Sequence, residues 1–235
     1  MEFHQARQDD EQSDAETYAA SRRSMVETIR EMAQETDDYA RGGVSENVLA
    51  VMQRVPRHRF VPADQLSSAY FNQALPIGHD QTISQPYIVA LVAELLQPGK
   101  HDTVLEIGTG SGYQAAVLAE LAGQVYSVEI VAPLAVSAEK LLRSLGYDNI
   151  AVRHGDGTQG WPQHAPFDCI TVAAATPHVP PALLAQLKPG GRLVIPLGGW
   201  SYAQQLMLLT KDRDGVMHNE AIIPVRFVPL TGGDA

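Results

Sequence analysis

The sequence contains a single cysteine among its 235 residues, so no disulfide can form within the chain. Cys169 lies in an apolar run at residues 167–173, where we expect it to pack as a small apolar side chain. The eight histidines show no spacing typical of metal ligands, and one cysteine makes a zinc site a poor expectation. We therefore predict no metal site and a reducing, cytoplasmic setting.

Long apolar runs are also missing. No stretch reaches the roughly 18 uninterrupted apolar residues that indicate a membrane-spanning helix. The first residues are polar, and no basic segment leads into an apolar one as in a secretory signal. We predict no membrane partner.

The chain also has no excess of positive charge. The chain has 27 acidic residues against 17 lysines and arginines, a net charge of −10. Eleven of the acids but only four of the bases lie in residues 1–40, so the remainder of the chain is close to neutral. No basic stripe could neutralise many phosphates, and we predict no nucleic-acid partner.

The N-terminal segment is polar and acidic, and residues 1–20 are short of large apolar groups. Such a segment cannot bury enough surface to offset the entropy lost on ordering, so we predict a disordered acidic tail at residues 1–20. Residues 21–235 form one domain in this prediction. Apolar residues recur at helical spacing at residues 25–33 and 48–55, with Ser45 as an N-cap, and these two helices should cover the domain.

Downstream of a loop at residues 70–86, helical and extended patterns alternate. We expect helices at residues 87–92, 114–121, 134–145 and 183–187, and strands at residues 104–107, 124–129, 150–153, 167–173, 192–196, 205–210 and 222–228. Gly146 should follow the end of the third of these helices. This alternation predicts an α/β fold of the Rossmann-like kind, a mostly parallel sheet with helices on both faces.

One stretch, residues 104–113, joins an apolar strand to a helix through a glycine-rich turn. Glu106 precedes the glycines Gly108, Gly110 and Gly112, which alternate with other residues. The dinucleotide fingerprint has its third glycine one position later, so this spacing disfavours a pyrophosphate. A nucleoside-containing ligand at a strand end and helix N-terminus fits, although a glycine-rich turn alone also occurs as plain structure.

Two further strands end in residues that could contact the same ligand. Glu129 closes the second strand, where a carboxylate can accept hydrogen bonds from both hydroxyls of a ribose. Asp156 and Gly157 follow the third strand. The alternatives are a solvated acid at a strand end and an ordinary Asp-Gly turn.

These features together resemble the S-adenosylmethionine site of Rossmann-like methyltransferases. Several motifs narrow the resemblance over residues 41–231 to the protein-L-isoaspartate O-methyltransferase family. They are LPIG at 75–78, QTISQPY at 81–87, the glycine turn, GDG at 155–157, LKPGGRL at 187–193 and VPLT at 228–231. The resemblance implies transfer of a methyl group from S-adenosylmethionine to the carboxylate of isoaspartyl residues in damaged peptides and proteins, which initiates their repair.

By the same resemblance Ser84 is the active-site serine, and Thr82 and Ile83 bind the substrate beside it. A carboxylate is already ionised at neutral pH, so Ser84 needs only to hold it by a charge-assisted hydrogen bond. Without the resemblance, Ser84 is a turn or N-cap serine before the helix at Pro86. We assign Glu106, the three glycines, Glu129, Asp156 and Gly157 to the cofactor, and we expect a monomer.

Two other functions remain open at this level. An enzyme of the same fold could methylate a small molecule or RNA, and a binding module could retain the cofactor site without catalysis. Thr231 could approach the cofactor from the C-terminal segment, and the small residues after the fourth strand could leave room for substrate.

Overall fold

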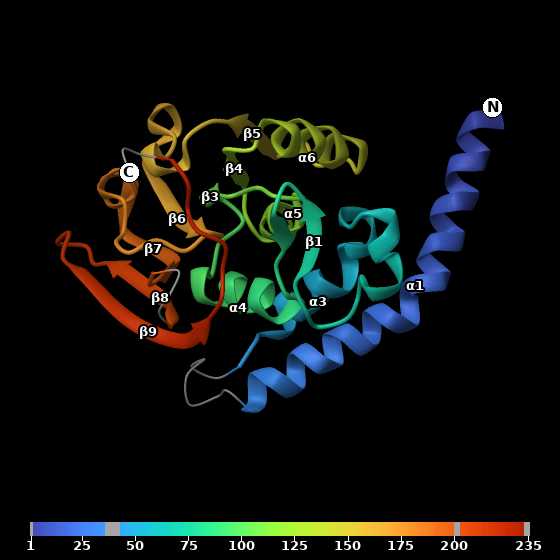
Figure 1. Ribbon diagram of the computed structural model, residues 1–235, viewed down its shortest axis with the longest axis horizontal. Coiled ribbons are helices and arrows are strands. Elements are labelled where there is room, and N and C mark those ends of the chain that lie inside the picture. Colours follow the sequence, from blue (N-terminus) through green and yellow to red (C-terminus); the bar gives the residue numbers. More distant parts are fainter. Residues whose placement is uncertain (1, 36–42, 200–202, 233–235) are drawn as a thin grey trace.

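The computed structural model describes residues 2–35, 43–199 and 203–232, and its centre is a seven-stranded sheet (Figure 1). Its strands lie in the order β5-β4-β3-β6-β7-β8-β9. Their bounds are β3 Thr103–Ile107, β4 Gln124–Glu129, β5 Ile150–His154, β6 Phe167–Val172, β7 Leu187–Leu197, β8 Gln204–Lys211 and β9 Met217–Val225. The first five in sequence pair in parallel, whereas β8 is antiparallel to both β7 and β9. The predicted mostly parallel sheet is confirmed.

The strand order reverses at β3, which pairs with β4 on one side and with β6 on the other. In an open parallel sheet the connections leave this point in opposite directions, and a crevice opens beyond the carboxyl ends of the strands. The glycine turn follows β3 directly, so it lies in this crevice.

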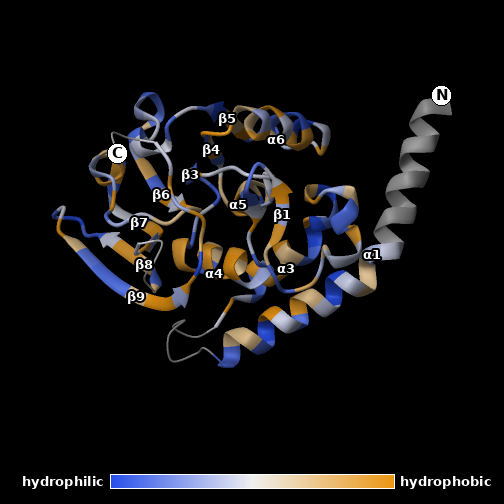
Figure 2. Ribbon diagram, in the orientation of Figure 1, coloured by the Kyte–Doolittle hydropathy of each residue, from blue (hydrophilic) through white to orange (hydrophobic). Residues whose placement is uncertain are grey.

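Helices and short helical turns cover both faces of the sheet. The helices are α4 Pro86–Leu96, α5 Tyr113–Leu121, α6 Ala132–Ser144 and α7 Pro181–Gln186. Successive strand residues face opposite sides: Val104 packs in the apolar layer under α4 and α5, while Leu105 packs in the layer that contains Leu183 of α7. Figure 2 shows apolar residues gathered along α4 and the central strands.

Helix ends follow the sequence closely. Gly146 has φ +85°, and the N–H of Tyr147 donates to the carbonyl of Leu142, which satisfies the last turn of α6 as predicted. The cover helix α3, Glu46–Arg54, is capped by the side chain of Ser45, which accepts a hydrogen bond from the N–H of Val48.

The N-terminal helix begins earlier than the sequence suggested. α1 runs Glu2–Glu35, and the side chain of Tyr18 stacks on His58 with ring centroids 4.2 Å apart. Contacts between the cover and the domain therefore start before residue 20, the predicted end of the tail.

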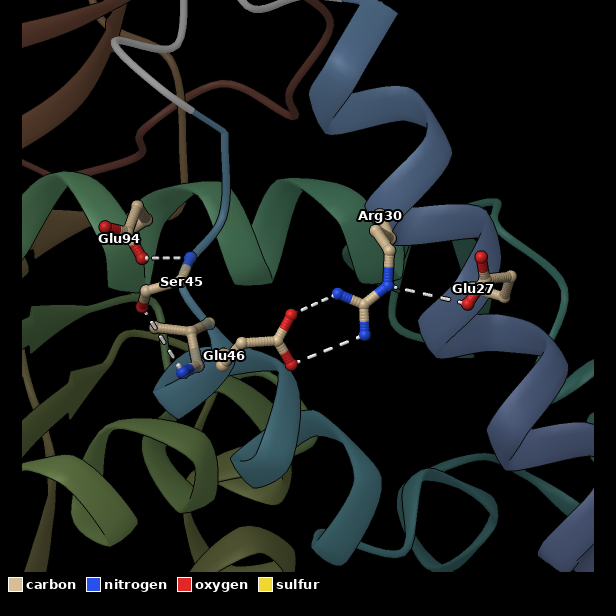
Figure 3. Close-up of polar contacts among 6 residues, drawn as sticks. Glu27, Arg30, Ser45, Glu46 and Glu94 are labelled. Atoms are coloured by element: carbon tan, nitrogen blue, oxygen red, sulfur yellow. Dashed lines mark hydrogen bonds and ion pairs between the residues drawn. The ribbon is translucent and has the colours of Figure 1, made fainter.

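Polar contacts join α1, α3 and α4 (Figure 3). The guanidinium of Arg30 in α1 pairs with the carboxylates of Glu46 in α3 and of Glu27 one turn earlier. The N–H of Ser45 donates to Glu94 of α4 at 2.8 Å. The cover is thus fixed to α4, the helix that follows Ser84.

The predicted loop at residues 70–86 contains a small hairpin. β1, Leu75–Gly78, pairs antiparallel with β2, Gln81–Ile83. His79 and Asp80 form its turn with positive φ angles. Strands of three and four residues are too short to show periodicity, so the sequence pattern did not indicate them. Short helical turns at Arg57–Phe60, Ala63–Ser68, Gly157–Gln159 and Pro162–His164 were not predicted either.

Candidate active site

A cavity of about 490 Å³ opens at the carboxyl ends of the central strands. This volume is within the usual range of small-molecule sites, about 300–1,000 Å³. Its walls come from four segments: the β2 hairpin and the loop into α4, the glycine turn, the ends of β4 and β6, and the chain after β9. The crevice expected from the sheet topology is therefore a formed site.

The glycine turn forms the floor of the cavity in a backbone conformation that favours glycine. Gly108, Gly110 and Gly112 have φ angles of +91°, +54° and +89°. A side chain at Gly112 would also press against Leu142 of α6, at 3.2 Å. Gly108 and Gly110 line the cavity and Gly112 does not. The first two glycines are available to a ligand, whereas the third allows close helix packing.

Thr82, Ile83 and Ser84 line the cavity next to the glycine turn. A Cβ atom placed on Gly110 would lie 3.5 Å from the Ile77 side chain and 4.0 Å from the Thr82 carbonyl. The structure therefore brings together two motifs that lie more than twenty residues apart in the sequence.

Ser84 itself immediately precedes the N-cap of α4, which is Gln85, and Pro86 occupies the first turn. Among the described residues, none of the hydrogen bonds involves the Ser84 hydroxyl, so it does not serve as the predicted alternative N-cap. Helix α4 has 11 residues, and its positive N-terminal end favours an anion nearby. The hydroxyl is available to an anionic ligand in the cavity.

Glu129 lies at the cavity end of β4 with only 5% of its surface exposed. Its carboxylate accepts hydrogen bonds from the N–H of Gly110 at 2.8 Å and of Val131 at 2.9 Å. Two backbone donors fix the carboxylate and leave each oxygen a further lone pair. The same residue therefore holds the glycine turn and presents acceptors to a ligand.

Glu106, assigned to the cofactor from the sequence, lies beneath the turn and does not line the cavity. Its carboxylate accepts a 2.6 Å hydrogen bond from Ser127 and a 3.1 Å one from Gln114. Complete burial raises the pKa of Glu106 to about 7, against the lowering effect of these two hydrogen bonds.

Glu106 reaches two residues of the cavity lining, Gln114 by a direct hydrogen bond and Thr109 through Ser127. Gln114 lines the cavity, and so does Thr109, whose hydroxyl lies 2.6 Å from that of Ser127. Glu106 thus orients lining groups from below. Its position indicates that it supports these groups and does not itself contact a ligand in the cavity.

Of the neighbouring residues Asp156 and Gly157, only the glycine lines the cavity. Gly157 lines the cavity, and a side chain there would collide with Ile107. The carboxylate of Asp156 accepts hydrogen bonds from the N–H and hydroxyl of Thr158, both at 2.8 Å, and is outside the lining. Asp156 shapes the turn that presents Gly157.

The chain after β9 forms a wall that the sequence analysis largely missed. Lining residues run from Pro224 to Thr231, so Thr231 is at the cavity as suggested. The N–H of Leu230 donates to the carbonyl of Ala175 at 2.7 Å, which fastens the segment across the end of β6. The VPLT motif was a signal, but no periodic pattern places an irregular segment over a distant strand.

Within the described residues, no group of three or more histidine, cysteine, aspartate or glutamate side chains is arranged to hold a metal ion. Across the same residues, no helix combines the length and the apolar character needed to cross a membrane. The thiol of Cys169 is buried against the Leu96 carbonyl, and burial raises its pKa to about 12. It packs as expected and is not a nucleophile.

Comparisons with known proteins agree on one family. A family model described as protein-L-isoaspartate(D-aspartate) O-methyltransferase (PCMT) matches residues 31–235. The protein-L-isoaspartate O-methyltransferase 2 of Syntrophobacter fumaroxidans is 55% identical over 217 residues, which cover 92% of this chain and 88% of that protein. The protein of the same name from a Polaromonas species is 56% identical over 209 residues, covering 88% and 99%.

Solved structures share the fold. One protein-L-isoaspartate O-methyltransferase structure has a TM-score of 0.79 at 28% identity and covers 90% of this chain and 66% of its own. A Plasmodium falciparum structure in complex with S-adenosyl-L-homocysteine has a TM-score of 0.72 at 24% identity, covering 88% of this chain and 97% of its own.

Proposed function

This chain belongs to the protein-L-isoaspartate(D-aspartate) O-methyltransferase family, and we propose that it methylates the free carboxylate of L-isoaspartyl residues in damaged peptides and proteins. The methyl donor is S-adenosylmethionine. One observation supports the assignment most directly: the free Ser84 hydroxyl and the glycine turn line a single cavity. Donor and acceptor sites are therefore adjacent.

The cavity fits S-adenosylmethionine by size and by chemistry. When bound, this cofactor supplies an electrophilic sulfonium methyl group. We assign its amino-acid end to the backbone at Gly108 and Gly110, where the absence of Cβ atoms permits close approach, and its ribose to Glu129. Gly157 lines the site at a point where a side chain would collide with Ile107. A relative in the same fold holds S-adenosyl-L-homocysteine, the product of methyl transfer, which supports this assignment.

Ser84 acts on the methyl acceptor in this proposal. The isoaspartyl carboxylate is ionised at neutral pH and needs no general base, so orientation should dominate the rate. The Ser84 hydroxyl donates a charge-assisted hydrogen bond to one carboxylate oxygen, and the N-terminus of α4 favours its negative charge. Thr82 and Ile83 contact the peptide around it.

Glu106, Gly112 and Asp156 complete the proposed site from outside the lining. Glu106 orients Gln114, Gly112 allows α6 to approach the turn, and Asp156 fixes the turn before Gly157. Their substitution should change cofactor binding through the lining groups that they hold.

We also propose a cytoplasmic monomer that acts without a metal ion, a membrane or a nucleic acid. The neutral balance of charge outside the N-terminal segment supports the last point. Since damaged proteins share no sequence, the enzyme should recognise the isoaspartyl backbone more than its neighbours.

Two peptides that differ only in the linkage of one aspartate test the function. The purified protein should form base-labile methyl esters on the isoaspartyl peptide and leave the aspartyl twin unlabelled. Equal labelling of both, or labelling of RNA or a small molecule in preference, would contradict the assignment. Cofactor binding without turnover would instead indicate a binding module.

A further inference from the structure

Among the residues that the structure describes, formal charge in the cavity lining is confined to Glu129 and Arg226. Glu129 is buried and accepts two backbone hydrogen bonds. Arg226 is exposed and lies in the segment after β9. The lining therefore carries one negative and one positive residue.

Arg226 has no partner for its guanidinium within the described part of the chain. Most other described arginines do have one: Arg30, Arg54 and Arg143 pair with glutamates, and Arg57, Arg153 and Arg192 donate to backbone carbonyls. Exposed Arg23, Arg59 and Arg213 also lack a partner, but all three lie outside the cavity lining, and Arg213 is in the β8–β9 turn. A free cation at a substrate cavity calls for an anion from the substrate.

The backbone around Arg226 is fixed on both sides. Val225 ends β9 and pairs with Gln204, whose side-chain amide makes two hydrogen bonds with the backbone of Phe227. The base of the Arg226 side chain is thus held at the cavity wall while its guanidinium stays accessible. Such a residue can select a charged group at low entropic cost to the backbone.

We propose that Arg226 is a specificity residue that binds a second carboxylate of the substrate, one that lies close to the isoaspartyl residue in the peptide. The carboxylate to be methylated is a poorer partner, because an ion pair would withdraw charge from the attacking oxygen and Ser84 already serves it.

This inference rests on the proposed function, and blocked peptides test it. Each peptide has an acetylated N-terminus, an amidated C-terminus and one isoaspartyl residue. Glu or Gln is placed at one position at a time, among the two residues before and the two residues after the isoaspartyl residue. The wild-type protein should show a KM about two- to fivefold lower for at least one Glu peptide than for its Gln twin, the scale of an exposed ion pair. High salt should reduce the difference.

Variants of Arg226 show which substrate carboxylate it binds, the one to be methylated or a neighbouring one. Arg226→Gln should abolish the preference, and Arg226→Glu should reverse it, while the charge-matched control Arg213→Gln should retain it. A preference that survives in Arg226→Gln overturns the proposal. So does a KM that rises equally for Glu and Gln peptides, because Arg226 would then bind the reacting carboxylate. Failure of the proposed function looks different, since no blocked isoaspartyl peptide would then be methylated by the wild-type protein.

Discussion

The side-chain amide of Gln204 makes two hydrogen bonds with the backbone of Phe227. Its oxygen accepts from the Phe227 N–H at 2.6 Å, and its nitrogen donates to the Phe227 carbonyl at 3.2 Å. Gln204 is 4% exposed, so this pairing continues the β8–β9 contact beyond Val225, where the strand ends. One buried side chain therefore helps to hold the wall of the cavity that carries Arg226, together with the backbone hydrogen bond from Leu230 to Ala175.

Replacing Gln204 by methionine should loosen this wall while keeping the volume of the side chain. We expect the free energy of unfolding to fall by about 1–3 kcal/mol, because Phe227 loses partners for a partly buried donor and acceptor. The KM for an isoaspartyl peptide should rise as well. Denaturant unfolding and steady-state kinetics measure both effects. Gln205→Met on the same strand is the matched control. Equal changes in the two variants would show that the hydrogen bonds between Gln204 and Phe227 do not hold this wall.

The centre of the sheet was predictable from the sequence because β3 and β6 are buried along nearly their whole length and are mostly apolar. Val104 and Leu105 sit in opposite apolar layers, as their alternation requires. The β1–β2 hairpin was not predictable, since its seven strand residues are too few to show a period. Motif resemblance located it as a functional segment without revealing its structure.

The residues of the site also differ in how far the sequence could place them. Gly108, Gly110, Glu129 and Ser84 could be placed from motifs that end at strand termini. The supporting position of Glu106 could not, because the sequence does not show whether a residue beside a turn points into a cavity or beneath it. Arg226 was not singled out, because the sequence pattern placed it inside a strand expected at residues 222–228, whereas β9 ends at Val225.

Ser84→Ala should reduce turnover and leave cofactor affinity nearly unchanged. The lost hydrogen bond to an ionised carboxylate is worth about 1.5–3 kcal/mol, which corresponds to roughly ten- to hundredfold in rate. Single-turnover kinetics with saturating peptide, together with calorimetric titration of the cofactor, separate the two effects. Ser137→Ala on α6 serves as the surface control. A wild-type rate in Ser84→Ala would remove the residue from the catalytic site.

Glu129→Ala should weaken cofactor binding by about 1.5–3 kcal/mol, the range for a lost hydrogen bond to a charged group. Part of the loss comes through Gly110, whose N–H no longer has the carboxylate as acceptor. Calorimetry with S-adenosyl-L-homocysteine measures the change without turnover. Glu139→Ala, which removes the same charge from the exposed side of α6, should bind normally. An unchanged dissociation constant in Glu129→Ala would refute the ribose assignment.

The disordered acidic tail expected at residues 1–20 stays a prediction. Deleting residues 1–16 should alter the free energy of unfolding by less than about 0.5 kcal/mol, as surface changes usually do. Tyr18→Ala in the full chain should cost about 1 kcal/mol, because it removes the stack on His58. Chemical denaturation compares them. A deletion more costly than the point substitution would show that the first residues contribute contacts of their own.

Glu106 should make stability depend on pH in a defined window. Burial raises its pKa from 4.5 to about 7, so between these values the folded protein holds a proton that the unfolded chain has released. The wild-type protein therefore loses stability as pH rises through this window, by at most about 3 kcal/mol at about 1.4 kcal/mol per unit.

Glu106→Gln removes that titration and keeps an acceptor for Ser127. Its free energy of unfolding relative to the wild-type protein should consequently increase from pH 5 to pH 7 and level off above. Urea unfolding of both proteins across this range measures the difference, in which every other titrating group cancels. A difference that stays flat would mean that Glu106 is ionised in the folded protein throughout. Its carboxylate would then be held by Ser127 and Gln114 strongly enough to offset its burial.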